Sequence, residues 1–319
     1  MVVRGPTLKL SSGAEMPALG LGTWLSKPNE VGNAVRHALD CGYRLIDTAE
    51  AYGNEKEIGD ALQEYFKAGK VKREDVFVTT KCFCNHFRLE QMNAAIRESL
   101  KKLQLDYVDL YLAHSPAALN EDNSIPEHPV TIEQIWQNLE SVYKKGYAKA
   151  IGVSNFTVAQ MERISKIATI PIHNLQVECY LYLPQFELAE FCKKHNITFT
   201  AYSPIGSPGR FSANVWVTNN LGVEWKHTPN PLEDELVKKL SGKYHKTAAQ
   251  ILLRYLLQRG FSPIPKSVNN KRIEENWNIF DFELSAAEMK ELNELKKNYR
   301  TGSWDFLKGH PEDPFKNER

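Results

Sequence analysis

The run Val108-Asp-Leu-Tyr-Leu-Ala-His114 (VDLYLAH) decides the fold, because it is almost continuously apolar where a half-exposed strand would alternate. The stretch AIGVSN at 150–155 has the same character. Strands of this kind are covered on both faces, as in a parallel sheet flanked by helices. Both runs end on polar side chains, His114 in one and Ser154 with Asn155 in the other.

Apolar or β-branched runs of this kind recur along the whole chain. They lie at 19–22, 43–46, 76–80, 107–113, 148–153, 175–177, 198–201 and 262–265. Apolar residues at i, i+3 and i+4 spacing between them predict helices at 55–67, 89–103, 132–145, 158–167, 186–195 and 248–258. Alternating strands and helices favour right-handed crossovers, a parallel sheet and, with eight units, an α/β fold of the closed (β/α)8 TIM barrel type.

Local signals refine this prediction. Residues 7–10 and 14–17 predict an N-terminal β-hairpin around a glycine-containing turn. Asn54 to Glu57 and Thr157 to Gln160 match the capping-box pattern of helix starts. Gly69 and Gly146 follow expected helix ends. No linker or shift of composition marks a second domain, so we expect one domain over 1–319.

Composition narrows the function. The 319 residues carry a net charge of +1 and are 42% hydrophobic, which gives no electrostatic reason to expect nucleic acid or an anionic membrane as partner. The first residues lack the apolar stretch of a signal peptide, and no run approaches the roughly 20 apolar residues of a membrane span. Five cysteines without framework spacing favour a reducing, cytoplasmic location. Cys82, Cys84 and His86 are spaced too tightly for a usual metal knuckle, so we expect no metal there.

A polar or aromatic residue follows every predicted strand. In barrel order these residues are Trp24, Asp47 with Tyr52, Lys81, His114, Ser154 with Asn155, Gln176, Tyr202 with Ser203, and Lys266 with Ser267. Each alone is more often a cap, a packing group or a solvated charge. Barrel closure would bring them together at the carboxyl end of the strands, where enzymes of this fold build their sites.

Four of these residues form a consistent catalytic set. A buried ammonium beside a phenol favours the phenolate, so we expect Lys81 to lower the pKa of Tyr52. Asp47 would keep Lys81 protonated once both are desolvated. Tyr52 then becomes a general acid. His114 would give a directional hydrogen bond to a substrate oxygen.

The chain resembles the aldo-keto reductase superfamily, and most the aldose/aldehyde reductase branch. The resemblance rests on GLGTW (20–24), LIDTAEAYGNEKEIG (45–59), TTK (79–81), DLYLAHSP (109–116), AIGVSNF (150–156), NLQVECY (174–180), AYSPIGSPGR (201–210) and IPKSVNNKRIEEN (264–276). It implies NADPH-dependent reduction of an aldehyde or ketone to an alcohol. Hydride would pass from nicotinamide to the carbonyl carbon, with Tyr52 as acid, Lys81 and Asp47 tuning it, and His114 orienting the carbonyl.

The resemblance also implies a binding site for NADPH/NADP+. The implied residues are Thr23, Trp24, Ser154, Asn155, Gln176, Tyr202, Ser203, Ile205, Ser207, Lys266, Ser267, Arg272, Glu275 and Asn276. Independently, Arg272 and Asn276 share one face of a helix start, where anions are favoured. Lys266 and Arg272 offer two cations to a 2′-phosphate, which favours NADPH over NADH. A Gly-x-Gly-x-x-Gly motif is missing after Gly20, so a Rossmann domain is not expected.

The substrate pocket is where the chain departs from that branch. Trp24, Phe83, Ser115 and Trp304 are its expected lining, and Phe83 and Ser115 stand where the branch commonly has tryptophan. Gly209 replaces an acidic residue that helps hold a loop over the cofactor, which predicts faster cofactor release. The long segment 206–231, with Trp216 and Trp225, either lines the pocket or covers barrel helices. The tail 299–319 is expected over the pocket mouth.

Two other functions remain open at this stage. A reductase-like barrel with a structural or regulatory role would need none of the catalytic set. A barrel hydrolase would use two carboxylates such as Asp47 and Glu178, and would leave Lys81 and Arg272 without a role. Within the reductase hypothesis, a small carbonyl compound is the expected partner. The sequence does not separate sugars, lipid aldehydes and ketones, and it carries no signature of oligomeric state beyond the monomer that the resemblance implies.

Overall fold

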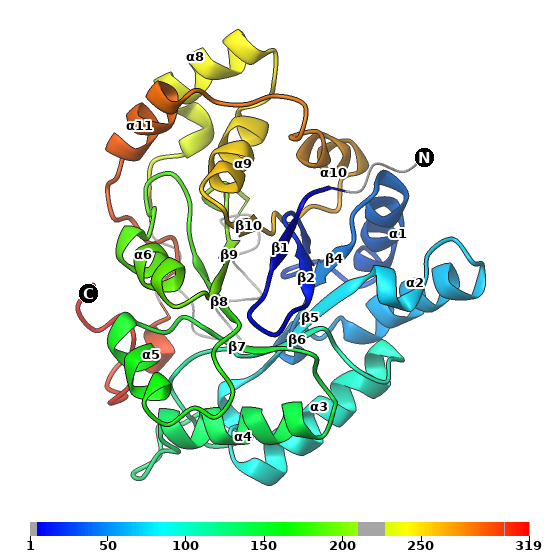
Figure 1. Cartoon of the computed structure of the whole chain (residues 1–319), viewed down its shortest axis with the longest axis vertical. Coiled ribbons are helices and arrows are strands. Elements are labelled where there is room, and N and C mark those ends of the chain that lie inside the picture. The colour runs from blue at the N-terminus through cyan, green and yellow to red at the C-terminus, as the bar shows by residue number, and fades with distance from the viewer. Residues whose placement is uncertain (1–4, 210–226, 303, 319) are drawn as a thin grey trace.

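A closed barrel of parallel strands forms the centre of the molecule. The computed structural model describes residues 5–209, 227–302 and 304–318, and Figure 1 shows the strands around a central axis with helices outside them. The strands are β3 (Leu21–Gly22), β4 (Leu45–Asp47), β5 (Phe77–Cys82), β6 (Leu110–Ala113), β7 (Ile151–Ser154), β8 (Asn174–Glu178), β9 (Thr198–Tyr202) and β10 (Ser262–Pro263). Their order, β10-β9-β8-β7-β6-β5-β4-β3, confirms all eight predicted strands and their parallel pairing.

The first and last strands meet and close the barrel. The backbone N–H of Gly20 donates to the carbonyl of Pro263, and that of Gly22 donates to Pro265, each over 3.1 Å. A Cβ atom at position 22 would lie 2.6 Å from the carbonyl oxygen of Ile264. Glycine is therefore required for the two backbones to approach this closely.

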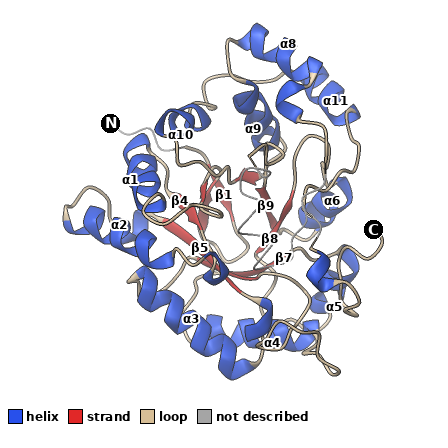
Figure 2. Cartoon of the chain, turned by 180° about the vertical axis from the view of Figure 1, so that it is seen from behind, coloured by secondary structure: helices blue, strands red, loops and turns tan. Residues whose placement is uncertain are grey.

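Helices cover the outside of the barrel, as Figure 2 shows from the opposite side. They are α1 (Val31–Cys41), α2 (Glu55–Lys67), α3 (Leu89–Leu103), α4 (Ile132–Lys144), α5 (Val158–Ser165), α6 (Phe186–Lys194), α8 (Glu235–Tyr244), α9 (Ala248–Gln258), α10 (Asn270–Trp277) and α11 (Ala286–Glu294). The six predicted helices are confirmed, three of them to the residue. The sequence pattern did not single out α1, α8 and α11.

The helix-boundary predictions had mixed outcomes. Thr157 and Gln160 form the predicted capping box at α5, and Gly69 and Gly146 have positive φ angles of 66° and 78° after α2 and α4. The predicted capping box at Asn54 is wrong, because its side chain makes no cap hydrogen bond. Its amide is used elsewhere, since it donates to the carbonyl of Thr23 and accepts from the hydroxyl of Thr48.

The predicted hairpin is confirmed as β1 (Thr7–Lys9) and β2 (Glu15–Pro17). Leu10 and Met16 from the hairpin region pack with Leu45, Phe77 and Leu110 inside the barrel. Those three residues begin or nearly begin their strands, so the hairpin covers the amino-terminal end of the barrel. The carboxyl end, with its ring of polar residues, is left for a site.

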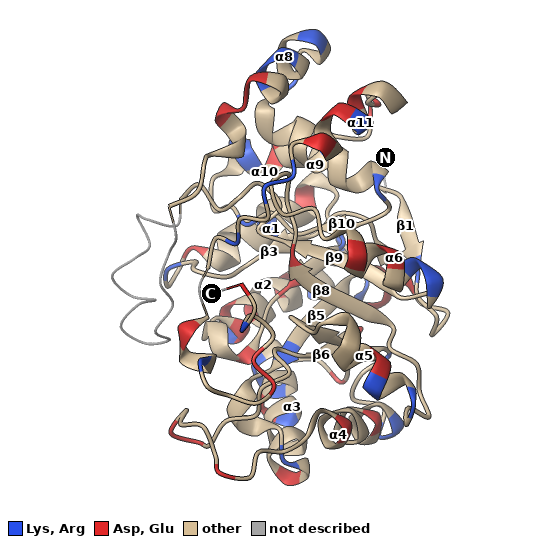
Figure 3. Ribbon diagram, turned by 90° about the vertical axis from the view of Figure 1, so that its left-hand side faces the viewer, with Lys and Arg blue, Asp and Glu red and all other residues tan. Residues whose placement is uncertain are grey.

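Charges of both signs are distributed along the described helices. In Figure 3 basic and acidic residues are interspersed along the helices rather than separated by sign. Among the described helices, none combines the length and apolar character needed to cross a membrane.

Candidate active site

A buried ion pair joins the ends of β4 and β5. The Nζ atom of Lys81 lies 2.6 Å from Oδ1 of Asp47, and the two residues are 0% and 2% exposed. Lys81 also donates to the carbonyl of Thr48 over 2.8 Å. Burial lowers the pKa of Lys81, and the carboxylate of Asp47 opposes that shift. The second oxygen of Asp47 accepts from Nε2 of Gln176 at 2.7 Å, so both carboxylate oxygens are paired.

Tyr52 lies against this pair. It ends the short helix η1 (Glu50–Tyr52), and Gly53 turns the chain with a φ of 67°. Nζ of Lys81 lies 3.3 Å from the Tyr52 hydroxyl and 5.0 Å from the centre of its ring. The structure therefore brings Asp47, Lys81 and Tyr52 together as the sequence predicted.

The expected direction of the Tyr52 pKa was wrong. Burial, and secondarily the carboxylate of Asp47, raise the pKa of Tyr52 well above that of an ordinary phenol. The positive charge of Lys81 is largely offset by Asp47 at 2.6 Å, so burial decides the direction. Tyr52 consequently holds its proton at neutral pH, as a proton donor must.

His114 follows β6 and faces Tyr52. Their ring centres are 5.8 Å apart in an edge-on arrangement. Burial, with the nearby charge of Lys81, lowers the pKa of His114 well below its ordinary value, so the imidazole is neutral at neutral pH. Its Nδ1 atom is buried and has no hydrogen-bond partner among the described residues. Such a ring has unused capacity to pair with a bound ligand.

A second polar group lies beside the catalytic set, at the ends of β7 to β9. The hydroxyl of Tyr202 donates to Oδ1 of Asn155 over 2.8 Å. The amide nitrogen of Asn155 donates to the carbonyl of His114 and to Oγ of Ser154, which is also buried. Since Gln176 binds Asp47, these predicted cofactor residues connect directly to the catalytic set.

Aromatic rings surround this region. The Phe83 ring lies 6.0 Å and the Trp304 ring 6.1 Å from His114, and Trp24 lies 6.3 Å from Tyr52. Three of the four residues expected to line the pocket are thus beside the catalytic rings. Ser115 differs, because it is fully buried and its Oγ accepts from the backbone of Ala117. Its side chain offers no exposed surface to a ligand.

The remaining predicted cofactor residues extend from the first and last strands. Thr23 is buried and donates to the carbonyl of Asp47, while Ser207 donates to Ser203 after β9, close in sequence to Ile205. The predicted residues at and near α10 are the exposed cations Lys266 and Arg272, the partly exposed acid Glu275, and the buried polar residues Ser267 and Asn276. Asn269 caps α10 by accepting from the backbone of Arg272.

The C-terminal tail is anchored beside the pocket by contacts that the sequence did not predict. Glu178, at the end of β8, accepts from the backbone N–H of Thr301 at 2.7 Å and lies 3.5 Å from Arg300. Arg300 also pairs with Glu318 at 2.6 Å. We call Glu178, Arg300, Thr301 and Glu318 the tail anchor. It engages the Glu178 carboxylate that a hydrolase would need.

Part of the predicted segment 206–231 lies outside the described residues. Trp216 and Trp225 belong to the undescribed part of 206–231. Gly209 is described, but the expected effect on cofactor release stays a prediction. The Cys82 sulfur lies 3.5 Å from the carbonyl of His86, and Nδ1 of His86 lies 3.2 Å from Oε2 of Glu50.

Comparisons with known proteins identify the family of the chain. The model of the Aldo/keto reductase family matches residues 18–297. Aldo-keto reductase family 1 member A1 of Gallus gallus is 44% identical over 303 residues, which cover 91% of this chain and 89% of that protein. Aldo-keto reductase family 1 member C13 of Mus musculus is 42% identical, and the match covers 98% of this chain and 98% of that protein.

Solved structures of the same family are similar to this chain over nearly its whole length. An aldose reductase from Schistosoma japonicum has a TM-score of 0.87 at 39% identity, over 98% of this chain and 99% of that one. A Bombyx mori aldo-keto reductase in complex with NADP has a TM-score of 0.89 at 36% identity, with the same coverage.

Proposed function

The chain belongs to the aldo/keto reductase family, and we propose that it reduces aldehydes to alcohols with NADPH, using Tyr52 as the general acid. The observation that carries the proposal is the contact of the buried Lys81 with both Asp47 and the Tyr52 hydroxyl, beside the neutral ring of His114. In this arrangement Tyr52 can give a proton and His114 a hydrogen bond to the same substrate oxygen.

The polar groups around this point suit a nicotinamide dinucleotide. Ser154, Asn155 and Gln176 present hydroxyl and amide groups of the kind that pair with a carboxamide. The Tyr202 ring, next to Asn155, would stack on a flat heterocycle. Lys266 and Arg272 would hold the 2′-phosphate, with Ser267, Glu275 and Asn276 at the adenine end. Bound NADPH supplies the hydride that reduces the carbonyl carbon.

The catalytic side chains supply what the carbonyl oxygen needs. The neutral imidazole of His114 donates a hydrogen bond that fixes the direction of the oxygen. As negative charge develops there, the Tyr52 hydroxyl gives up its proton. Lys81, 3.3 Å away, stabilises the phenolate that remains. Asp47 keeps Lys81 charged in its buried position.

The aromatic surroundings favour one class of substrate. Trp24, Phe83 and Trp304 lie beside the catalytic rings, and such surfaces bind apolar bodies better than hydroxyl-rich ones. We therefore propose aromatic and lipid-derived aldehydes ahead of sugars or ketones. A steady-state panel should give the higher kcat/KM for benzaldehyde-type and medium-chain aldehydes. A preference for glucose or xylose would contradict this ranking.

The central test is NADPH consumption with glyceraldehyde by the wild type and by Tyr52→Phe. Loss of the general acid should lower kcat by about 10²-fold or more, while NADPH still quenches tryptophan fluorescence. Tyr65→Phe is the matched control, since its hydroxyl donates to the carbonyl of Arg36, away from the proposed site. Equal rates for Tyr52→Phe and wild type would remove Tyr52 from this role. A non-catalytic barrel predicts no NADPH consumption by any of the three.

We also propose that the described barrel and tail form one domain over 1–319, acting as a cytoplasmic monomer. The tail supports the single domain, because Arg300 and Thr301 contact Glu178 in strand β8 of the barrel itself. Sedimentation equilibrium should give the 36.4 kDa of one chain. A mass of twice that value would contradict the monomer.

A further inference from the structure

Helices α1 and α10, far apart in sequence, lie side by side in the outer ring (Figure 1). Tyr43, just after α1, donates its buried hydroxyl to the carbonyl of Ile273 in α10 over 3.1 Å. Its ring also packs on Trp277 at 4.8 Å between centres. These contacts fix how the two helices face each other, so side chains that meet across them are held in a defined geometry.

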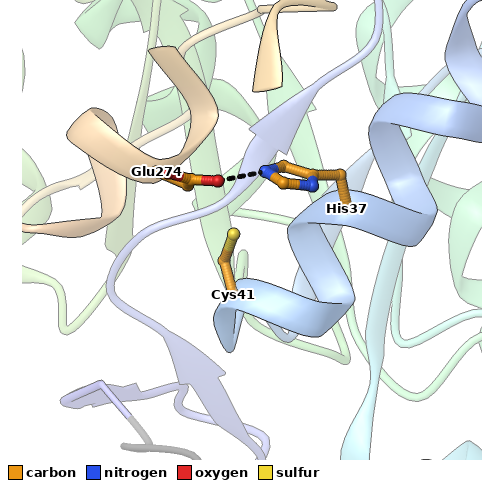
Figure 4. Close-up of side chains that lie close together, drawn as sticks. All are labelled: His37, Cys41 and Glu274. Carbon is orange, nitrogen blue, oxygen red and sulfur yellow. Dashed lines mark ion pairs between the residues drawn. The ribbon is translucent and has the colours of Figure 1, made fainter. Parts of the chain in front are cut away.

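Three metal-ligand side chains meet across this pair of helices. His37 and Cys41 are four residues apart on α1, which places them on one face, and Glu274 reaches them from α10. Figure 4 shows the imidazole and the carboxylate facing each other, with the Cys41 sulfur beside the gap between them. Their ligand atoms all lie within 4.8 Å of one another, and in the described part of the chain no other His, Cys, Asp and Glu side chains converge this way.

The contact between His37 and Glu274 has unusual geometry. Nε2 of His37 lies 2.9 Å from Oε1 of Glu274, yet this buried nitrogen makes no properly directed hydrogen bond. In a tetrahedral site, two ligand atoms at about 2.0–2.1 Å from the metal ion are themselves about 3.3 Å apart, slightly more than this pair. The distance alone also suits a hydrogen bond, so it is the missing direction that leaves the His37 nitrogen available to a metal ion.

We propose that His37, Cys41 and Glu274 bind a single Zn²⁺ ion. Imidazole, thiolate and carboxylate are the three ligand types that zinc takes in proteins, and no other abundant divalent ion suits this mixture better. The zinc–sulfur bond of about 2.3 Å requires the sulfur to move toward the other two ligands. A rotation of the Cys41 side chain, or of the half-exposed Glu274, provides that movement. Solvent would complete a tetrahedral site.

The rival explanation is an ordinary ion pair beside a spare thiol. That arrangement would leave Cys41 without a role and predicts no dependence of metal binding on the sulfur. The zinc proposal uses none of the residues assigned to the proposed reductase activity, although Glu274 shares α10 with Arg272, Glu275 and Asn276.

The test uses the full-length, tag-free protein with Co²⁺ as a spectroscopic probe and Zn²⁺ in competition. Wild type should bind one Co²⁺ with an intense thiolate-to-cobalt charge-transfer band, and one equivalent of Zn²⁺ should abolish the band. Cys41→Ser should remove the band, and His37→Gln or Glu274→Gln should weaken zinc affinity at least about tenfold. Zinc should also raise the Tm of wild type, because it binds only the folded state.

Exposed residues of the same types provide matched controls. His128→Gln and Glu283→Gln change an exposed histidine and an exposed glutamate outside the site, and both should keep the wild-type band and zinc affinity. If wild type shows no thiolate band, or if Cys41→Ser binds zinc as tightly as wild type, the site is not a zinc site. Unchanged far-ultraviolet circular dichroism would show that a variant that fails to bind is still folded.

Discussion

Nζ of Lys81 and Oδ1 of Asp47 lie 2.6 Å apart, and neither side chain is appreciably exposed. A buried pair of this kind has already lost the solvation of both charges, so its effect depends on both partners being present. Removing the carboxylate would leave an ammonium in the core next to Tyr52, and that ammonium would lose its proton. The same contact therefore supports both the stability of the barrel and the charge state that the proposed reaction requires.

Asp47→Asn should lower both kcat and stability. The amide still accepts from Gln176, but it no longer compensates the charge of Lys81. We expect kcat with an aldehyde to fall about 10²-fold, and the free energy of unfolding in urea to fall by about 3 kcal/mol.

Asp109→Asn is the matched control for this variant. Asp109 also forms a largely buried pair, with Arg73 at 2.8 Å, but at the start of β6, away from the mouth. It should lose stability while kcat stays within about twofold of wild type. A normal kcat in Asp47→Asn, despite the loss of stability, would show that Asp47 only supports the fold.

Arg272→Leu should weaken NADPH binding and leave NADH binding unchanged. The guanidinium at the start of α10 is exposed and suits the 2′-phosphate, which NADH lacks. A charged hydrogen bond of this type contributes about 1.5–3 kcal/mol, so the Kd for NADPH should rise roughly tenfold or more. Fluorescence titration with both dinucleotides measures the difference.

Lys271→Leu provides the control, because it removes the same charge one residue earlier from an exposed side chain that pairs only weakly, at 3.9 Å, with Glu275. Its NADPH affinity should change less than about threefold, since surface pairs contribute little. Equal weakening of NADPH and NADH by Arg272→Leu would mean that Arg272 does not read the 2′-phosphate.

The sequence predicted the barrel and the catalytic contacts because both follow from local patterns. Apolar runs and helix periodicity set the order of elements, and closure brings residues at strand ends together whatever their sequence distance. The direction of the Tyr52 pKa was wrong because it depends on the balance between burial and two nearby charges, which only coordinates give.

Long-range contacts between single residues were not predictable. Asn54 looks like a helix cap in sequence, but its amide is bound to Thr23 and Thr48. The pairing of Glu178 with Arg300 joins residues 122 positions apart with no local signal. Ser115 occupies an expected pocket position, and only the path of the backbone after β6 reveals that its side chain is buried.

Glu178→Gln should loosen the tail and thereby change substrate binding. Glutamine still accepts from the backbone of Thr301, but Arg300 loses its buried counter-charge. Trp304 follows Arg300 by four residues, and its ring lies beside that of His114. We expect the KM for an aromatic aldehyde to rise about tenfold, or about 1.4 kcal/mol, with an unchanged Kd for NADPH.

Glu318→Gln is the milder counterpart, because that carboxylate is 41% exposed and its pairing with Arg300 is partly screened. Its KM should rise less than about threefold. If Glu178→Gln binds aromatic aldehydes as wild type does, the tail does not shape the pocket.

The protein should become less stable in mild acid, because His173 binds a proton more readily in the unfolded state than in the folded state. It is buried under α4, and its Nδ1 accepts from the backbone N–H of Ile151 at 3.0 Å, which requires a neutral ring. Burial lowers the pKa of His173 to about 4, below the 6.5 of an unfolded chain. The unfolded state therefore binds the proton first, so the stabilising effect is complete above pH 6.5 and is lost as the pH falls toward 4. Over that interval the free energy of unfolding should fall by about 3 kcal/mol through this residue.

His173→Asn isolates that contribution, because an asparagine oxygen can accept from Ile151 at any pH. Urea unfolding between pH 4.5 and 7.5 should show a shallower pH dependence in the variant than in wild type, while His114 and His310, whose pKa values are also lowered, still contribute to both. Parallel curves for the two proteins would show that folding does not lower the pKa of His173. The acid sensitivity would then come from other groups, among them His114 and His310, whose pKa values burial also lowers.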